Sequence, residues 1–137
     1  MKLSTVDAIA GMLGSIKLTR IPDKEVKNAL VGDYLQLRRL AKKAGEDAEE
    51  LRKKFQADWM EEMNAVTELR SKNEPIVGHK EYLDAEADAN KAIYDIYEEE
   101  VEVSLIAVPL VAFLDACEDE LTLQQIAFLQ DNGIIEE

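Results

Sequence analysis

Two pairs of acidic residues have a spacing that could hold a metal ion. Glu46 and Glu49 are three positions apart, and so are Glu81 and Asp84, so each pair of carboxylates would share one face of a helix. Carboxylate oxygens are ligands that Mg²⁺ accepts. However, a chain with 29 acidic residues in 137 produces such spacings readily. We therefore expect exposed side chains at these positions and no bound metal or cofactor.

The single histidine and the single cysteine form no recognisable catalytic arrangement. A di-iron or di-manganese helical bundle needs two Glu-x-x-His pairs, but His79 is alone and has Ile76 three positions before it. Cys117 lies in an apolar stretch, which is typical of a buried thiol. Neither a nucleophile motif nor a phosphate-binding glycine loop occurs. We expect an ordinary exposed histidine, no catalytic residues and a non-enzymatic protein.

Two acidic runs stand out in the second half of the chain. One spans residues 98–102, and the other consists of Asp115 with residues 118–120. Their spacing does not fit an EF-hand loop, which needs alternating acids and a central glycine. We interpret both runs as solvated surface, with mimicry of a nucleic-acid backbone as the alternative.

The net charge of −13 is distributed unevenly. Residues 20–54 contain ten basic and seven acidic residues, whereas residues 81–137 contain sixteen acidic residues and one lysine. An acidic half repels phosphate, so direct binding to nucleic acid is disfavoured. The length suits one domain, residues 1–137, and a hydrophobic content of 47% is ordinary for a folded protein.

No segment has the composition of a membrane span or of a secretion signal. Uncharged apolar runs stay well below the length of about 18 residues that a spanning helix needs. Asp7 interrupts the start of the chain before any long apolar region develops. A single cysteine excludes an internal disulfide. We expect a cytoplasmic protein that does not bind membranes.

A long helix is predicted over residues 22–72. Pro22 is favoured in a first turn, and apolar residues then recur at alternating spacings of four and three, as in a coiled-coil seam. Gly45 predicts a bend or break near residue 45. After Phe55 the spacing changes to successive fours, a stutter that locally unwinds a supercoil. The seam consists of Leu30, Tyr34, Leu37, Ala41, Ala44, Ala48, Leu51 and Phe55.

A return helix is predicted over residues 80–99, after a turn at residues 73–79. One side of this helix has the same heptad spacing, and Asn90 within it is a polar residue of the kind that fixes register. Folding the second helix back on the first gives a helical hairpin. The seam at residues 30–55 then contacts either this side or another subunit, and both alternatives stay open. The side consists of Leu83, Ala87, Asn90, Tyr94 and Tyr97.

Residues 100–105 alternate between polar and apolar side chains, which predicts a strand with one buried face over residues 100–108. Its expected partner is the connector at residues 16–21, which also alternates, and Pro109 is expected to end it. Short helices are predicted over residues 110–131.

Capping signals mark two of the short helices. Thr122 and Gln125 have the spacing of a capping box at the start of the last helix, and Asn132-Gly133 is a typical helix ending. Ser4 and Asp7 have a similar spacing near the start of the chain. We therefore predict a first short helix that is capped by Ser4.

The order of these features resembles small, uncharacterised helical proteins encoded among phage and prophage structural genes. The residues that carry the resemblance are 21–26 at the start of the long helix, 97–105 after the return helix, and 121–127 with 134–137 at the end. The resemblance implies an assembly context and brings no established activity.

These patterns together predict a mainly α fold: a long antiparallel helical hairpin with short flanking helices and one small two-stranded β pair. The predicted function is interaction with another protein, or self-association, as a phage or prophage accessory or assembly factor. One alternative is an acidic mimic of nucleic acid that inhibits a DNA-binding protein. The other is a Mg²⁺-dependent hydrolase that resembles the all-helical nucleotide pyrophosphohydrolases.

Overall fold

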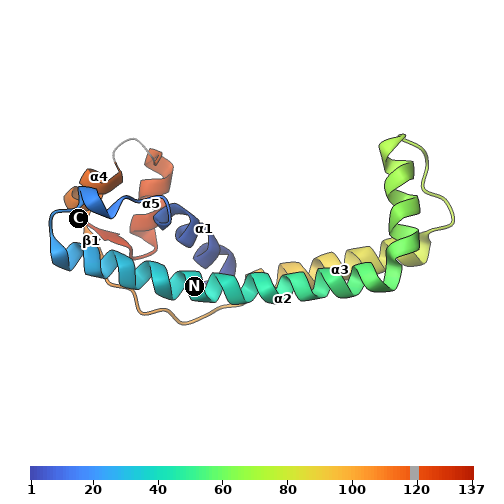
Figure 1. The fold of residues 1–137 in the computed structure, drawn as a ribbon, viewed down its shortest axis with the longest axis horizontal. Coiled ribbons are helices and arrows are strands. Elements are labelled where there is room, and N and C mark those ends of the chain that lie inside the picture. Colours follow the sequence, from blue (N-terminus) through green and yellow to red (C-terminus); the bar gives the residue numbers. More distant parts are fainter. Residues whose placement is uncertain (118–120) are drawn as a thin grey trace. The chain divides into compact units, whose positions relative to one another are not determined.

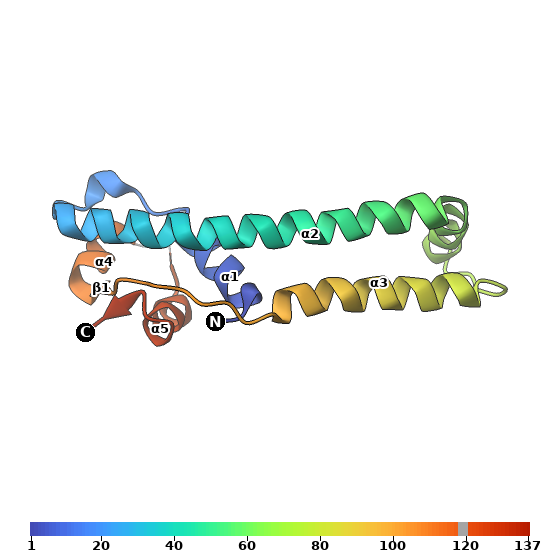
Figure 2. The same ribbon diagram turned by 90° about the horizontal axis from the view of Figure 1, so that it is seen from below.

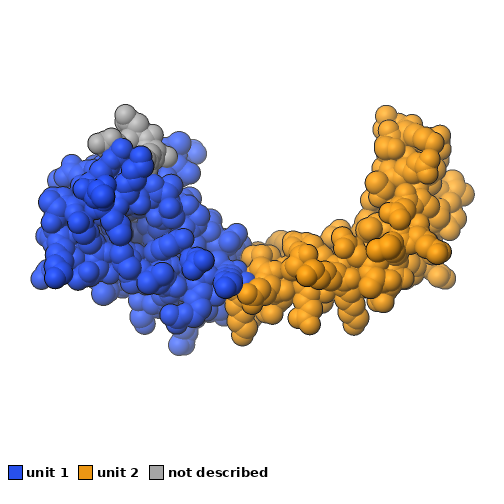
Figure 3. All heavy atoms as spheres, in the orientation of Figure 1, with its two compact units in different colours: residues 1–42, 100–137 blue, residues 43–99 orange. Residues whose placement is uncertain are grey.

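The protein is mainly α-helical, as its sequence predicts. The computed structural model describes residues 1–117 and 121–137. Where the sequence predicts one domain, the chain forms two compact units: unit 1 contains residues 1–42 and 100–137, and unit 2 contains residues 43–99 (Figure 3). The long helix α2 (Lys24–Ser71) contributes its first part to unit 1 and the remainder to unit 2.

Helix α2 begins two residues later than predicted because Asp23 caps it. One carboxylate oxygen of Asp23 accepts hydrogen bonds from the backbone N–H groups of Glu25 at 2.8 Å and Val26 at 3.4 Å. These N–H groups have no partner within the helix, so a capping carboxylate satisfies them and also suits the positive end of the helix dipole. Pro22 lies just outside the helix.

The predicted break at Gly45 is wrong, and the helix is interrupted instead at Trp59. Trp59 has non-helical backbone angles (φ −128°, ψ 21°). Figure 1 shows the sharp turn of α2 within unit 2. A mid-helix glycine costs only about 1 kcal/mol, and the neighbouring Ala44 and Ala48 are buried, so the helix continues through Gly45. The kink falls in the stutter after Phe55.

Unit 2 is the predicted helical hairpin. Helix α3 (Lys80–Glu98) runs beside the part of α2 that belongs to this unit (Figure 1, Figure 2). The turn lies at residues 72–79 and so begins one residue earlier than the predicted turn at 73–79. Asn73 adopts a left-handed backbone conformation (φ 53°), and the N–H of Glu74 donates to the carbonyl of Leu69 at 3.0 Å. This is a Schellman-type helix ending, with asparagine in the usual glycine position.

Unit 1 packs short helices around the first part of α2. These elements are α1 (Leu3–Leu13), the 3₁₀ helix η1 (Leu18–Arg20), α4 (Leu110–Cys117) and α5 (Leu123–Asp131). Strands β1 (Val108–Pro109) and β2 (Ile135–Glu136) form a two-stranded parallel sheet. Fully buried side chains from separate elements meet in one core; they include Val6, Ile9, Leu37, Phe113, Leu129 and Ile134.

The predicted strand pairing is wrong, although the expected small β pair exists elsewhere. The connector at residues 16–21 contains η1 and forms no strand, and residues 101–107 are extended without a strand partner. Pro109 is the last residue of β1, so the strand ends at this proline as predicted. Proline is tolerated because this strand is so short and needs few ladder hydrogen bonds. Its partner β2 follows Gly133, whose φ of 81° ends α5.

One of the two predicted caps is confirmed. Thr122 and Gln125 form the reciprocal capping box of α5, with hydrogen bonds of 3.2 Å and 2.8 Å. Ser4 does not cap α1, which begins at Leu3 and has Lys2 at its N-cap without a side-chain hydrogen bond. Lys2 forms an isolated β-bridge with Glu100, directly before the first residue of the helix.

Candidate functional site

The predicted seam on α2 lies against the rest of the same chain. Leu30 and Leu37 belong to the core of unit 1, and Ala44 and Ala48 are buried in unit 2. The other four seam residues are half-buried: Tyr34, Ala41, Leu51 and Phe55. The alternative in which this seam is free to meet a second subunit therefore does not hold for its buried members.

Helix α3 packs with a different side from the one predicted. Tyr82 is buried, and its ring centroid lies 5.6 Å from that of Phe55 and 6.0 Å from that of Trp59. Tyr97 is half-buried, whereas Asn90 and Tyr94 are exposed. The expectation that Asn90 and Tyr94 pack against the first helix is therefore wrong. Aromatic pairs at such centroid distances add about 0.5–1.5 kcal/mol beyond apolar burial, which favours the Tyr82 side over the adjacent Leu83 side.

A polar cluster completes the packing around Tyr82. Its hydroxyl donates to Glu86 at 3.0 Å, and Arg70 donates two hydrogen bonds to the same carboxylate at 2.7 Å and 3.1 Å. The hydrogen bonds from Arg70 hold the pKa of Glu86 below its ordinary value. Burial, followed by the contact with Glu86, raises the pKa of Tyr82. This cluster links the end of α2 to α3 and has a structural role.

His79 departs from the prediction of an exposed residue. It is half-buried at the start of α3, and its Nδ1 lies 3.4 Å from a carboxylate oxygen of Glu62. This contact joins α3 to the segment of α2 after the kink. No sequence pattern identifies it, because Glu62 and His79 are seventeen residues apart.

The side of α3 that carries the predicted seam is open to solvent in its middle. Ala87, Asn90 and Tyr94 are all exposed and recur at spacings of three and four, so they share one face of the helix. Tyr94 is 62% exposed. Tyrosine is enriched among the residues that dominate binding energy at protein interfaces, because it offers apolar area and a hydroxyl on a stiff side chain.

Unit 1 also has exposed apolar residues, a pair on α4. Val111 and Leu114 lie one turn apart and are exposed. Valine and leucine are under-represented among interface hot spots, and scattered exposed aliphatic residues are common on protein surfaces. We therefore rank the Tyr94 face above this pair as a contact surface.

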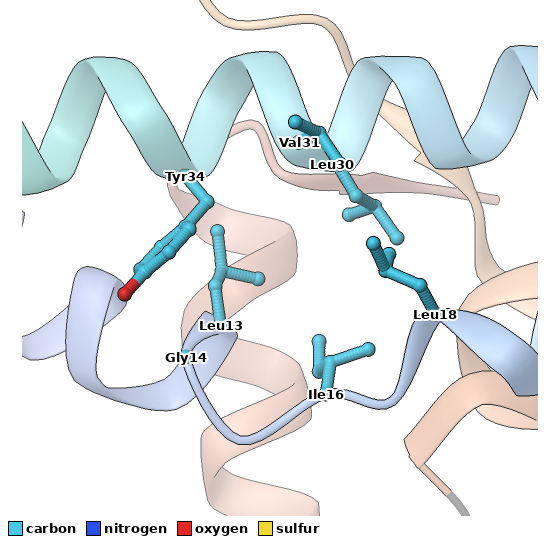
Figure 4. A pocket seen from close by; sticks show the side chains of 7 residues that line it. All are labelled: Leu13, Gly14, Ile16, Leu18, Leu30, Val31 and Tyr34. Carbon is cyan, nitrogen blue, oxygen red and sulfur yellow. The ribbon is translucent and has the colours of Figure 1, made fainter.

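An apolar cavity lies between the end of α1, the connector and α2 in unit 1 (Figure 4). Its volume is about 150 Å³, and its lining consists of Leu13, Gly14, Ile16, Leu18, Leu30, Val31 and Tyr34. Tyr34 also lines an adjoining shallow hollow, together with Asp7, Ala10, Gly11, Arg38, Ala41 and Lys42. Three of the predicted seam residues, Leu30, Tyr34 and Ala41, thus surround these two spaces.

Side chains of α2 fasten the extended segment that follows α3. The amide of Gln36 donates to the carbonyl of Ser104 at 2.9 Å and accepts from its N–H at 2.7 Å. Asp33 accepts a hydrogen bond from the N–H of Ile106 at 2.9 Å. These helix side chains supply part of the pairing that a neighbouring strand would give. The sequence reasoning missed both residues, because polar residues on a helix give no sign of a partner 68 or more positions away.

The structure does not gather the acidic pairs into a metal site. Glu46, Glu49, Glu81 and Asp84 are all exposed, and Glu49 contacts Arg52 at 3.4 Å. Within residues 1–117 and 121–137, no three histidine, cysteine or acidic side chains cluster as metal ligands would.

The first acidic run and the cysteine have ordinary surroundings. In the first run, Glu98 is half-buried and Glu100 lies 2.9 Å from the amino group of Met1. The second run lies partly outside the described residues, at 118–120. Cys117 is buried, as predicted, and its sulfur contacts the carbonyl of Leu114 at 3.8 Å.

Comparisons with protein-family models, curated proteins and solved structures find no match for this chain. None of the helices in the described ranges combines the length and the apolar character that crossing a membrane requires.

Proposed function

We propose that this is a non-enzymatic protein-interaction protein that contacts its partner through the exposed face of α3. The observation that carries the proposal is the exposure of Asn90 and Tyr94 on a helix whose other apolar side is packed against its own unit. A helix with a second apolar stripe can lay that stripe against another helix. Asn90 would fix the register of the pair at some cost in affinity.

The partner is a cytoplasmic protein or a second copy of this chain. Its setting is the assembly of a phage or prophage particle, which rests on the resemblance of residues 21–26 and 97–105 to proteins encoded among such genes. Direct binding to nucleic acid is disfavoured, because residues 81–137 contain sixteen acidic residues and one lysine.

The proposal is tested by tagged capture from the organism of origin with three forms of the protein. The wild type is compared with Tyr94→Ala and with Val111→Ser, which alters the competing apolar pair on α4. We expect one protein to be recovered with the wild type and with Val111→Ser, and to be lost with Tyr94→Ala. Loss with Val111→Ser alone would place the contact on α4 and contradict the proposal.

A further inference from the structure

The cavity in unit 1 has the size and lining of a site for one small apolar group. Leu13 comes from α1, Ile16 and Leu18 from the connector, and Leu30 from α2, and their side chains converge on one space (Figure 4). The volume is about 150 Å³. An aliphatic cavity of about this volume holds a molecule of roughly the size of benzene.

Basic side chains lie beyond one end of the cavity. Tyr34, Arg38 and Lys42 follow one another at intervals of four along α2, so each lies next to the preceding one on the helix surface. Arg38 and Lys42 line the hollow that Tyr34 separates from the cavity, with Asp7 as the one acid there. Within the described part of the chain, neither basic residue forms an ion pair.

The hydroxyl of Tyr34 is available between the apolar and the basic part. Tyr34 is half-buried, its hydroxyl is not among the buried side-chain atoms without a partner, and no hydrogen bond to another described residue uses it. Gly14 leaves room beside it, because a Cβ atom at that position would lie 3.5 Å from the Tyr34 oxygen and 3.3 Å from the carbonyl oxygen of Ala10.

We propose that this site binds a short-chain carboxylate, with its alkyl chain in the cavity and its carboxylate at Tyr34 and Arg38. The volume limits the buried chain to about six carbon atoms. The charge of the hollow selects an anion over a neutral or cationic head group. A peptide with an apolar and an acidic side chain is disfavoured, because its backbone amides need partners and the cavity lining offers only apolar side chains and Tyr34.

The site is tested by titration calorimetry with butanoate, hexanoate, octanoate and hexan-1-ol at low salt. We expect each methylene to tighten binding about fourfold until the cavity is filled near six carbons, with little gain from hexanoate to octanoate. Hexan-1-ol is expected to bind about fivefold more weakly than hexanoate, because it lacks the charge. Affinity that does not change with chain length would overturn the proposal, as would binding of acidic peptides in the absence of hexanoate binding.

Matched variants locate the binding. Arg38→Ala should weaken hexanoate about fivefold and leave hexan-1-ol unchanged, whereas Arg39→Ala, one position along the helix, should change neither. Leu18 is 41% exposed at the cavity margin, so Leu18→Trp should fill the space and abolish binding in a protein that stays folded by circular dichroism. Val31→Phe serves the same purpose if Leu18→Trp does not fold. Equal effects of Arg38→Ala and Arg39→Ala, or full binding by the filled variants, would refute the site.

Discussion

Replacing Asp33 with asparagine should make the stability of unit 1 less dependent on pH. Asp33 is only 2% exposed. Its Oδ1 accepts the hydrogen bond from Ile106, while its Oδ2 is buried without a partner among the described residues. Burial raises the pKa of Asp33 above its ordinary value of 3.8, and the hydrogen bond from Ile106 opposes this shift.

The sign of the effect follows from the raised pKa. The folded state favours the protonated carboxyl, so its contribution to stability is complete below the unfolded pKa and is lost as pH rises through the folded pKa. Asparagine keeps an acceptor for the N–H of Ile106 and cannot ionise. Any effect of its amide group on the free energy of unfolding is therefore the same at every pH. A buried polar group without a partner costs about 1–3 kcal/mol. For the ionised carboxylate of Asp33 we expect a cost at the low end of this range, about 1 kcal/mol, because its Oδ1 keeps the hydrogen bond from Ile106.

Equilibrium urea unfolding at pH 4, 6 and 8, followed by circular dichroism, measures this effect. The free energy of unfolding of Asp33→Asn minus that of the wild type should increase by about 1 kcal/mol from pH 4 to pH 8. Asp7→Asn, which removes an exposed acid from the same unit, should show no such trend. A constant difference for Asp33→Asn, or one that falls as pH rises, would refute the reasoning.

Three further predictions concern the packing, the contacts of the extended segment and the helix caps. Tyr82→Ala should destabilise unit 2 by about 3–5 kcal/mol, whereas Tyr94→Ala on the same helix should stay within about 0.5 kcal/mol of the wild type in urea unfolding. Gln36→Ala should cost about 1–2 kcal/mol, because it removes two hydrogen bonds to the extended segment, and should speed amide hydrogen exchange there. Thr122→Ala should cost about 1 kcal/mol through the lost cap, but Ser4→Ala should cost almost nothing in thermal unfolding; equal costs would contradict the assigned caps.

Local signals predicted most of the helices correctly. The capping box of Thr122 and Gln125, the turn at residues 73–79 and the heptad spacing on α2 each depend on residues within a few positions of one another. Interactions between residues this close together can be predicted from the sequence alone. The prediction of a break at Gly45 failed because the helix-propensity cost of a glycine, about 1 kcal/mol, is smaller than the free energy gained by packing the surrounding helix.

Contacts between distant residues explain what the sequence did not reveal. Residues 101–107 do alternate in burial as predicted. However, a pattern of burial does not identify which groups form hydrogen bonds with the backbone of the segment. Here Asp33 and Gln36 form them from α2. On α3, two apolar stripes lie side by side, and only the pairing of Tyr82 with Phe55 and Trp59 decides which is covered. The cavity depends in the same way on how α1 and the connector meet α2.

Site-specific photo-crosslinking on α3 tests the proposed contact surface most directly. A photoreactive amino acid is placed at position 94 or, as a control, at the exposed position 88 of the same helix, and the products formed in cells of the organism of origin are identified by mass spectrometry. We predict one covalent partner from position 94, either another protein or a second copy of this chain, and none from position 88. Identical products from both positions, or none from position 94, would contradict the claim that the Tyr94 face of α3 is the interaction surface.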